Sequence, residues 1–106
     1  MCIRDSDSVS SIEVLPEIVD AVGDKLDVLF DSGVRSGTDI AKALALGAKM
    51  VLIGRPCVYG LAMGGQKGAH HVLRCLLAEL ELSMRLSGVS SIEKEELNRS
   101  RLRLIK

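Results

Sequence analysis

Hydrophobic positions in residues 10–23 (SSIEVLPEIVDAVG) repeat at the three- and four-residue steps of an amphipathic helix. The apolar stripe consists of Ile12, Leu15, Ile18, Val19 and Val22. Ser10 followed by Glu13 matches a capping box, and Gly23 is typical of a helix end. Pro16 removes a backbone donor, so a helix that begins only at Pro16 is the alternative.

The middle of the chain alternates short apolar runs with one amphipathic segment. Residues 27–30 (DVLF) and 50–54 (MVLIG) are bounded by turn residues, which is typical of parallel strands buried on both faces. Between them, Ser36 and Asp39 form a potential capping pair at the start of a helix of about three turns. Its apolar face consists of Ile40, Ala43, Leu44 and Gly47. The order strand, helix, strand predicts a βαβ unit.

Helical signals continue after the second apolar run. Residues 55–65 predict a loop or a short helix opened by Pro56. Residues 68–88 then show a long helical period that ends at a glycine. The predicted packing face consists of Val72, Leu73, Leu76, Leu77, Leu80 and Met84. A further capping box, Ser90 with Glu93, predicts a short polar helix before the basic end RSRLRLIK.

The first six residues, MCIRDS, fit no hydrophobic period. They match the translation of ATG-TGT-ATA-AGA-GAC-AGN, which resembles the transposase end sequence joined to fragments in sequencing libraries. We therefore interpret residues 1–6 as an adapter artefact and exclude them from fold reasoning. The alternative is a genuine N-terminus. Residues 7–106 are then one domain or part of one.

Composition narrows the class of protein and its partners. The 106 residues are 47% apolar, and 14 basic side chains balance 14 acidic ones, so no charge surplus favours nucleic acid or an anionic membrane surface. Aromatic residues make up only 2%, which suits β-α units better than a β-sandwich. No apolar run reaches the roughly 18 residues of a membrane-spanning helix. The class predicted is α/β.

Cysteine usage bears on the compartment. Apart from Cys2, the chain has Cys57 and Cys75, an unpatterned pair that indicates reduced thiols and not a disulfide framework. We predict a cytoplasmic protein. A peroxisomal location stays open for a eukaryotic source, although the SRL tripeptide at residues 100–102 is followed by four more residues and carries no weight.

The candidate chemistry lies at two arginines that follow the two predicted strands. Arg35 and Arg55 stand at corresponding carboxyl ends, which lie on the same side of a parallel sheet. Their guanidinium groups and the backbone N–H groups near Gly33 and Gly54 can therefore converge on one anion, such as a phosphate. A helix opened by Pro56 could add its N-terminal dipole. This order matches the last βα units of a (β/α)8 barrel, where phosphate sites occur.

Each of these residues also has a purely structural interpretation. Either arginine alone is typical of a solvated or salt-bridged surface residue. Asp31 could orient Arg35, accept hydrogen bonds from ligand hydroxyls, or simply form a turn. His70 and His71 are adjacent, so at most one can face inward, and we favour a polar surface role over catalysis or metal binding. No metal site is predicted.

A family resemblance joins these motifs. Residues 28–88 are similar to the C-terminal part of the FMN-dependent α-hydroxy acid dehydrogenases, which include glycolate oxidase, lactate oxidase and lactate 2-monooxygenase. The motifs D-[GS]-G-V-R, G-T-D, K-A-L-A-L-G-A and I-G-R-P occur here in that order. The resemblance implies an incomplete (β/α)8 TIM barrel in this chain, because a whole barrel takes about 250 residues.

The resemblance also implies the cofactor and its site. FMN would be bound through the ribityl and phosphate groups by two segments, one after each strand. The implied binding residues are Asp31, Ser32, Gly33, Val34, Arg35, Gly54 and Arg55. Ser32 stands where many members have a glycine, a departure that resembles the lactate monooxygenase branch.

The implied activity is oxidation of an L-2-hydroxy acid to the 2-oxo acid by a homo-oligomeric full-length enzyme. The family's general base is a histidine in a His-Gly-Gly-Arg segment that would precede residue 7, so no catalytic residue is expected here. These 106 residues alone should therefore be inactive. Two alternatives remain open: another FMN- or phosphate-binding barrel, such as type 2 isopentenyl diphosphate isomerase or an IMP dehydrogenase relative, and a non-catalytic phosphate-binding or interaction module.

Overall fold

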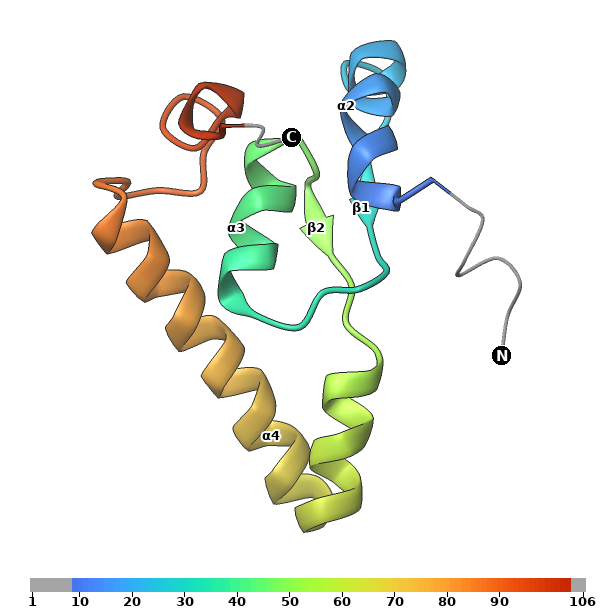
Figure 1. Cartoon of the computed structure of the whole chain (residues 1–106), viewed down its shortest axis with the longest axis vertical. Helices are drawn as coiled ribbons and strands as arrows, with labels where there is room; N and C mark the ends of the chain where they lie inside the picture. Colours follow the sequence, from blue (N-terminus) through green and yellow to red (C-terminus); the bar gives the residue numbers. More distant parts are fainter. Residues whose placement is uncertain (1–8, 104–106) are drawn as a thin grey trace.

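The computed structural model describes residues 9–103 (Figure 1). Its elements, in order, are α2 (Ser11–Val22), β1 (Leu29–Phe30), α3 (Gly37–Ala45), β2 (Met50–Val51), α4 (Arg55–Leu86) and the 3₁₀ helix η1 (Arg99–Arg101). The predicted α/β order is confirmed. The residues interpreted as an adapter artefact lie outside the described range. Within 9–103, no helix combines the length and the apolar character needed to span a membrane.

The two strands form a parallel pair. Leu29 lies opposite Met50 and Phe30 opposite Val51. Two further backbone hydrogen bonds extend the ladder at its ends, from Lys49 N to Val28 O (2.8 Å) and from Leu52 N to Phe30 O (2.8 Å). Both strands are shorter than the predicted runs. The reason is that the chain leaves the ladder soon after Phe30 and Leu52, toward α3 and α4 respectively (Figure 1).

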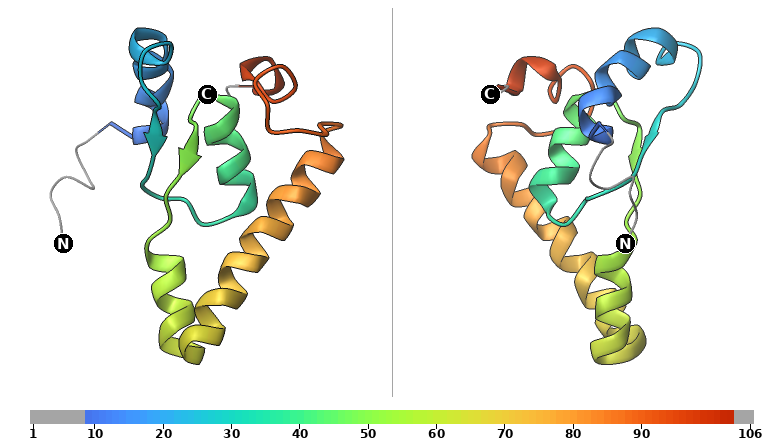
Figure 2. Two further views of the ribbon diagram at one scale, coloured as in Figure 1. Left: turned by 180° about the vertical axis from the view of Figure 1, so that it is seen from behind. Right: turned by 45° about the vertical axis from the view of Figure 1, so that its right-hand side comes forward.

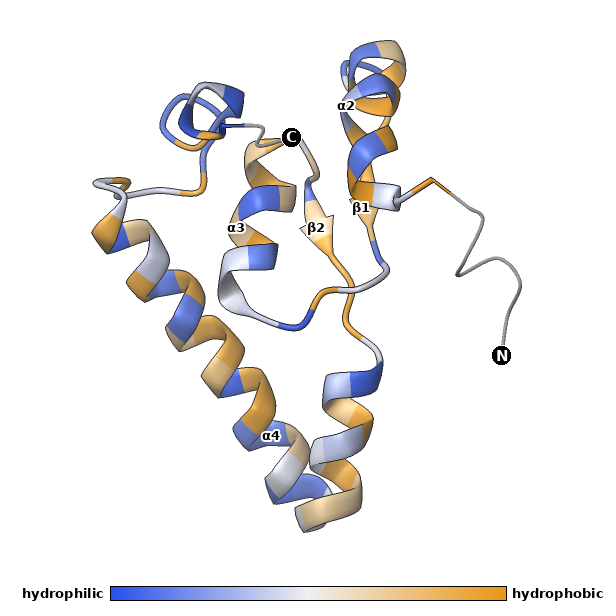
Figure 3. Ribbon diagram, in the orientation of Figure 1, coloured by the Kyte–Doolittle hydropathy of each residue, from blue (hydrophilic) through white to orange (hydrophobic). Residues whose placement is uncertain are grey.

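The core lies between α2, the two strands, α3 and α4, and its most extensive packing is that of α3 on α4. It consists of Leu15, Phe30, Val34, Ile40, Ala43, Ala48 and Leu76. Figure 3 shows both strands as hydrophobic along their length. The predicted face of α4 is only partly right, because Leu73 and Leu77 are exposed. Each lies one residue, about 100° of helix rotation, beyond the inward-facing Val72 and Leu76.

Helix α4 has two arms that meet at a sharp bend, and both views in Figure 2 show this tip far from the strands. The backbone is non-helical at Gly64 (φ −145°) and Gly65 (φ +62°). The arms, residues 55–63 and 66–86, come together at two other glycines. A Cβ on Gly68 would lie 2.0 Å from the carbonyl oxygen of Gly60. The first arm confirms the short helix expected near Pro56.

The predicted helix starts differ in outcome. Ser36 is confirmed as a side-chain cap, because Asp39 N donates to its Oγ (3.3 Å). At the start of α2, the Ser10 side chain makes no capping bond, so the predicted capping box is wrong there. Glu13 N donates instead to the Ser10 carbonyl oxygen (3.0 Å). Helix α2 begins at Ser11 and includes Pro16, so the alternative start at Pro16 is also wrong.

The short helix predicted after Ser90 is wrong. The Glu96 carboxylate Oε2 accepts hydrogen bonds from Ser90 Oγ (2.6 Å), Ser90 N (2.8 Å) and Ser91 N (3.1 Å). These bonds, led by that of the Ser90 hydroxyl, lower the pKa of Glu96, and they hold the segment in a turn. Leu97 then packs with Val89 and Ala45 in a second small core.

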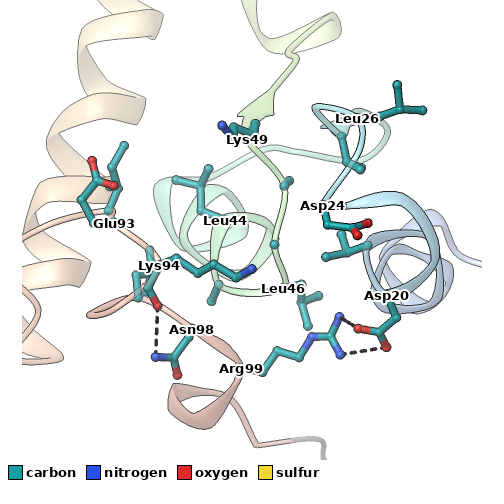
Figure 4. A pocket seen from close by; sticks show the side chains of 18 of the residues that line it. Asp20, Asp24, Leu26, Leu44, Leu46, Lys49, Glu93, Lys94, Asn98 and Arg99 are labelled. Atoms are coloured by element: carbon teal, nitrogen blue, oxygen red, sulfur yellow. Dashed lines mark hydrogen bonds and ion pairs between the residues drawn. The ribbon is translucent and has the colours of Figure 1, made fainter.

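The segment that follows is attached to α2 by one side chain. The Arg99 guanidinium contacts both carboxylate oxygens of Asp20 (3.1 and 2.9 Å) and donates to the Pro16 carbonyl oxygen (3.0 Å). We call these contacts of Arg99 with Asp20 and Pro16 the Arg99 clasp, and Figure 4 shows its ion pair beside a pocket of about 810 Å³. Lys49, Lys94 and Asp24 also line that pocket, so its charges are mixed.

Candidate phosphate-binding site

A second pocket lies at the carboxyl ends of the strands. Residues 31–35 line it from the loop after β1, and residues 52–56 line it from the connection between β2 and α4. Its volume is about 320 Å³. The seven residues expected from the sequence all line it: Asp31, Ser32, Gly33, Val34, Arg35, Gly54 and Arg55. Pro56, expected to open the helix beside the site, lines it too, whereas Leu52 and Ile53 were not predicted, although their position just before Gly54 was a usable signal.

Both arginines are exposed at this pocket. Within residues 9–103, neither guanidinium forms an ion pair with a carboxylate. The backbone of Arg35 is fixed, because its N–H donates to Asp39 Oδ2 (3.1 Å). Two positive charges and one negative charge, that of Asp31, thus line one small pocket, and neither guanidinium is paired, so the arrangement favours an anionic ligand.

Asp31 does not orient Arg35 within the described structure. Its carboxylate Oδ1 accepts a long hydrogen bond from Ser32 Oγ (3.4 Å), and its carbonyl oxygen accepts one from Ser11 Oγ (3.2 Å). These contacts agree with the turn-forming role and tie the loop to the start of α2. The exposed carboxylate still has accepting capacity for a ligand hydroxyl.

Glycine and valine contribute backbone to the pocket. Gly33 has a φ of +75°, and a Cβ added to Gly33 or Gly54 would meet no atom within 4 Å. The backbone is therefore open to close approach by a ligand. Val34 differs, because its side chain is buried in the core. Only its backbone is available to a bound group, which refines the sequence expectation.

Two helices begin near this pocket, and only α3 has side-chain acceptors on its first N–H groups. At α3, Gly37 N donates to Glu79 Oε2 (2.8 Å) and Asp39 N to Ser36 Oγ (3.3 Å). At α4, the N-cap residue Gly54 has no side chain and makes no capping bond. Pro56 has no N–H and Cys57 N donates to the Gly54 carbonyl oxygen (3.1 Å), so the Arg55 N–H is the free donor of this first turn. A helix N-terminus attracts anions through its free N–H groups and its dipole. An anion in the pocket should therefore interact with α4 and not with α3.

The remaining candidate residues lie away from the pocket lining. His70 and His71 are exposed on the second arm of α4, and His71 Nε2 lies 3.5 Å from Cys75 Sγ. Cys57 and Cys75 are free thiols. The described part of the chain contains no group of three side chains able to hold a metal ion.

Ser32 has a φ of +84°, the left-handed region that favours glycine. A β-branched side chain is least compatible with this conformation. We expect Ser32→Val to lower the free energy of unfolding of the full-length protein by about 1–2 kcal/mol relative to Ser32→Gly. Denaturant titration of both variants checks this, and equal midpoints would contradict the strained backbone.

Two arginines and two exposed glycines at the carboxyl ends of parallel strands are the arrangement expected of a phosphate site in an α/β barrel. The model of the FMN-dependent dehydrogenase family matches residues 4–104. The chain therefore belongs to this family, whose cofactor is FMN.

Individual relatives agree with this assignment. The chain is 71% identical over 91 residues to an FMN-dependent alpha-hydroxy acid dehydrogenase of Schizosaccharomyces pombe, covering 86% of this chain and 22% of the relative. It is 55% identical over 84 residues to human 2-hydroxyacid oxidase 1, covering 79% and 23%. The chain thus spans about a quarter of the length of these curated relatives.

A solved structure of an (S)-mandelate dehydrogenase mutant superposes with a TM-score of 0.85 at 41% identity. The match covers 92% of this chain and 27% of that structure. The α2–α4 arrangement is therefore part of a TIM barrel, as predicted, and the barrel is incomplete within this chain.

Proposed function

We propose that this segment binds the phosphate of FMN in an enzyme that oxidises an L-2-hydroxy acid to the 2-oxo acid. The observation that carries the proposal is the pocket in which two arginines, unpaired within the described residues, lie beside the start of α4, which has no side-chain cap. A phosphate dianion matches this combination of charge and open backbone. The family match supports FMN as the molecule that carries this phosphate.

Each kind of pocket residue would bind a different part of FMN. The forked guanidinium groups of Arg35 and Arg55 would pair with phosphate oxygens. The N–H groups near Gly33 and Gly54 would donate to the same oxygens, and Asp31 would accept from ribityl hydroxyls. When bound, FMN supplies an acceptor for the reducing equivalents of the hydroxy acid.

The family match also bears on the alternatives considered from the sequence. It favours the hydroxy acid dehydrogenases over the isopentenyl diphosphate isomerase and IMP dehydrogenase types of barrel. It equally favours an enzyme over a non-catalytic phosphate-binding module, because the relatives are oxidases and dehydrogenases. The cytoplasmic location, the homo-oligomeric state and an absence of nucleic-acid partners remain part of the proposal.

Anaerobic reduction of the flavin tests the activity. The full-length enzyme that contains this segment should purify with FMN, and L-lactate or glycolate should bleach its visible flavin absorbance. D-lactate is the matched control, and it should leave the spectrum unchanged. An FMN-loaded protein that no L-2-hydroxy acid reduces, with mandelate and longer aliphatic acids included, would overturn the proposed activity.

A further inference from the structure

Glu79 connects α4 to the start of α3 across 42 residues of sequence. It lies on the second arm of α4, and its Oε2 accepts the hydrogen bond from Gly37 N (2.8 Å, partly buried). Gly37 is the first residue of α3 and directly follows the loop that carries Arg35. Glu79 does not line the pocket. Its effect on a bound phosphate would therefore be transmitted through its contact with Gly37.

The backbones of α3 and α4 also approach each other closely at Gly37, beside the Glu79 hydrogen bond. A Cβ on Gly37 would lie 2.2 Å from Leu80 N and 2.4 Å from the Glu79 carbonyl carbon. Helix α3 therefore begins directly against the backbone of α4, with no side chain between them. Such packing leaves little freedom to shift, because even one added methyl group would have to displace backbone.

The same helix also carries the other half of the pocket. The second arm of α4 meets the first at Gly68 and Gly60, again with backbone against backbone. The first arm begins at Arg55. One bent helix thus contacts the Arg35 loop through Glu79 and supplies Arg55 itself, so it sets the relative position of the two arginines.

The negative charge of Glu79 has a second effect. A carboxylate at the N-terminus of α3 interacts favourably with the helix dipole and occupies the N–H of Gly37. It therefore competes with an external anion at α3, whereas α4 has no side-chain cap. Replacing Glu79 by an apolar residue would free the Gly37 N–H and release the loop at the same time.

We propose that Glu79 is a positioning residue for the FMN phosphate. It holds the Arg35 loop against α4 and directs the phosphate to the N-terminus of α4. The inference rests on the proposed function, because it assumes that the pocket takes this phosphate.

The test compares FMN and riboflavin affinities of apoenzyme variants of the full-length protein. Glu79→Leu should raise the Kd for FMN by about tenfold and that for riboflavin by less than about threefold. Glu79→Gln keeps an oxygen acceptor and should retain FMN affinity within about threefold. Glu81→Leu is the matched control, because Glu81 pairs with Arg85 on the exposed side of the same arm. It should leave both affinities unchanged.

Amide hydrogen exchange supplies a readout that is independent of cofactor affinity. Gly37 N–H should lose protection in Glu79→Leu and keep it in Glu81→Leu. If Glu79→Leu does not fold, Glu79→Asp replaces it, because the shorter side chain keeps the charge and loses reach. The Asp variant should show the same exchange change and the same selective loss of FMN.

The outcomes separate this inference from the proposed function. An equal loss of FMN and riboflavin affinity in the Glu79 variants, or no loss of either, overturns the positioning role. If Arg55→Met still weakens FMN selectively, the proposed phosphate site survives that result. If Arg55→Met also leaves FMN affinity unchanged, the proposed site itself is wrong.

Discussion

Replacing Arg55 with methionine in the full-length enzyme is expected to weaken FMN binding by about tenfold to a hundredfold. Arg55 begins α4, faces the small pocket and has no carboxylate partner within the described residues. A hydrogen bond to a charged group contributes about 1.5–3 kcal/mol, which converts to this range of affinity. Methionine keeps much of the apolar length of the side chain and removes the charge. Titration of the apoenzyme with FMN measures the change.

Riboflavin provides the control for this variant, because it lacks the phosphate. Its affinity should change little in Arg55→Met, which separates a lost phosphate contact from a general loss of fold. Arg35→Met should behave in the same way, and the double variant should lose less than the sum of the two single changes, since both arginines are proposed to contact one group. FMN affinity that stays at the native value in Arg55→Met would refute the assignment of Arg55 to the phosphate.

Gly68→Ala is expected to lower the free energy of unfolding by about 1–3 kcal/mol, the usual effect of overpacking. The added Cβ would lie 2.0 Å from the carbonyl oxygen of Gly60. Because the obstacle is backbone, no side-chain rotation can relieve the clash, and the two arms of α4 must separate. Thermal or denaturant unfolding of the full-length protein measures the loss. Since the first arm carries Arg55, FMN affinity should fall as well.

Gly64→Ala is the matched control for that variant. Gly64 lies in the same helix with a negative φ, and a Cβ there would meet nothing within 4 Å. Its effect should therefore stay within about 0.5 kcal/mol, as for other surface substitutions. Equal stability of the Gly64 and Gly68 variants would mean that the arms do not approach as closely as the structure shows.

The helices and the order of the fold followed from local patterns. The apolar steps around Leu15, Ile40 and Leu76 identified the faces that the core buries, because helical periodicity is fixed by a few neighbouring residues. Strand lengths did not follow, since a ladder ends where the backbone turns away and not where hydrophobicity ends. The Ser90–Glu93 prediction failed for a related reason. Glu96, a more distant acceptor, took the Ser90 N–H that the Glu93 carboxylate would have accepted, and Glu93 N donates to Ser91 Oγ and not to Ser90 Oγ.

Part of the candidate site could likewise be predicted from the sequence, and part could not. Arg35 and Arg55 could be predicted because strand ends in a parallel pair fall on one side, so sequence spacing alone places them together. Glu79 could not be predicted. It reaches Gly37 over 42 residues, and in the sequence it reads as one more polar position on the outer side of a long helix. The N-terminus of α4 was already expected to contribute to the site from Pro56, whereas the side-chain cap on α3 became apparent only with that contact.

The Arg99 clasp has a consequence for the order of folding. Arg99 and Asp20 are separated by 79 residues, so their contact closes a loop that contains both strands, α3 and α4. During synthesis, α3 and β2 emerge long before Arg99 does, and their contacts are local in sequence. Closing so long a loop costs more conformational entropy than forming a local contact. Local contacts that already shorten the loop reduce this cost, so they are expected to form before the Arg99–Asp20 contact. We therefore expect the contact at the end of α2 to form after the local contacts of β1, α3 and β2.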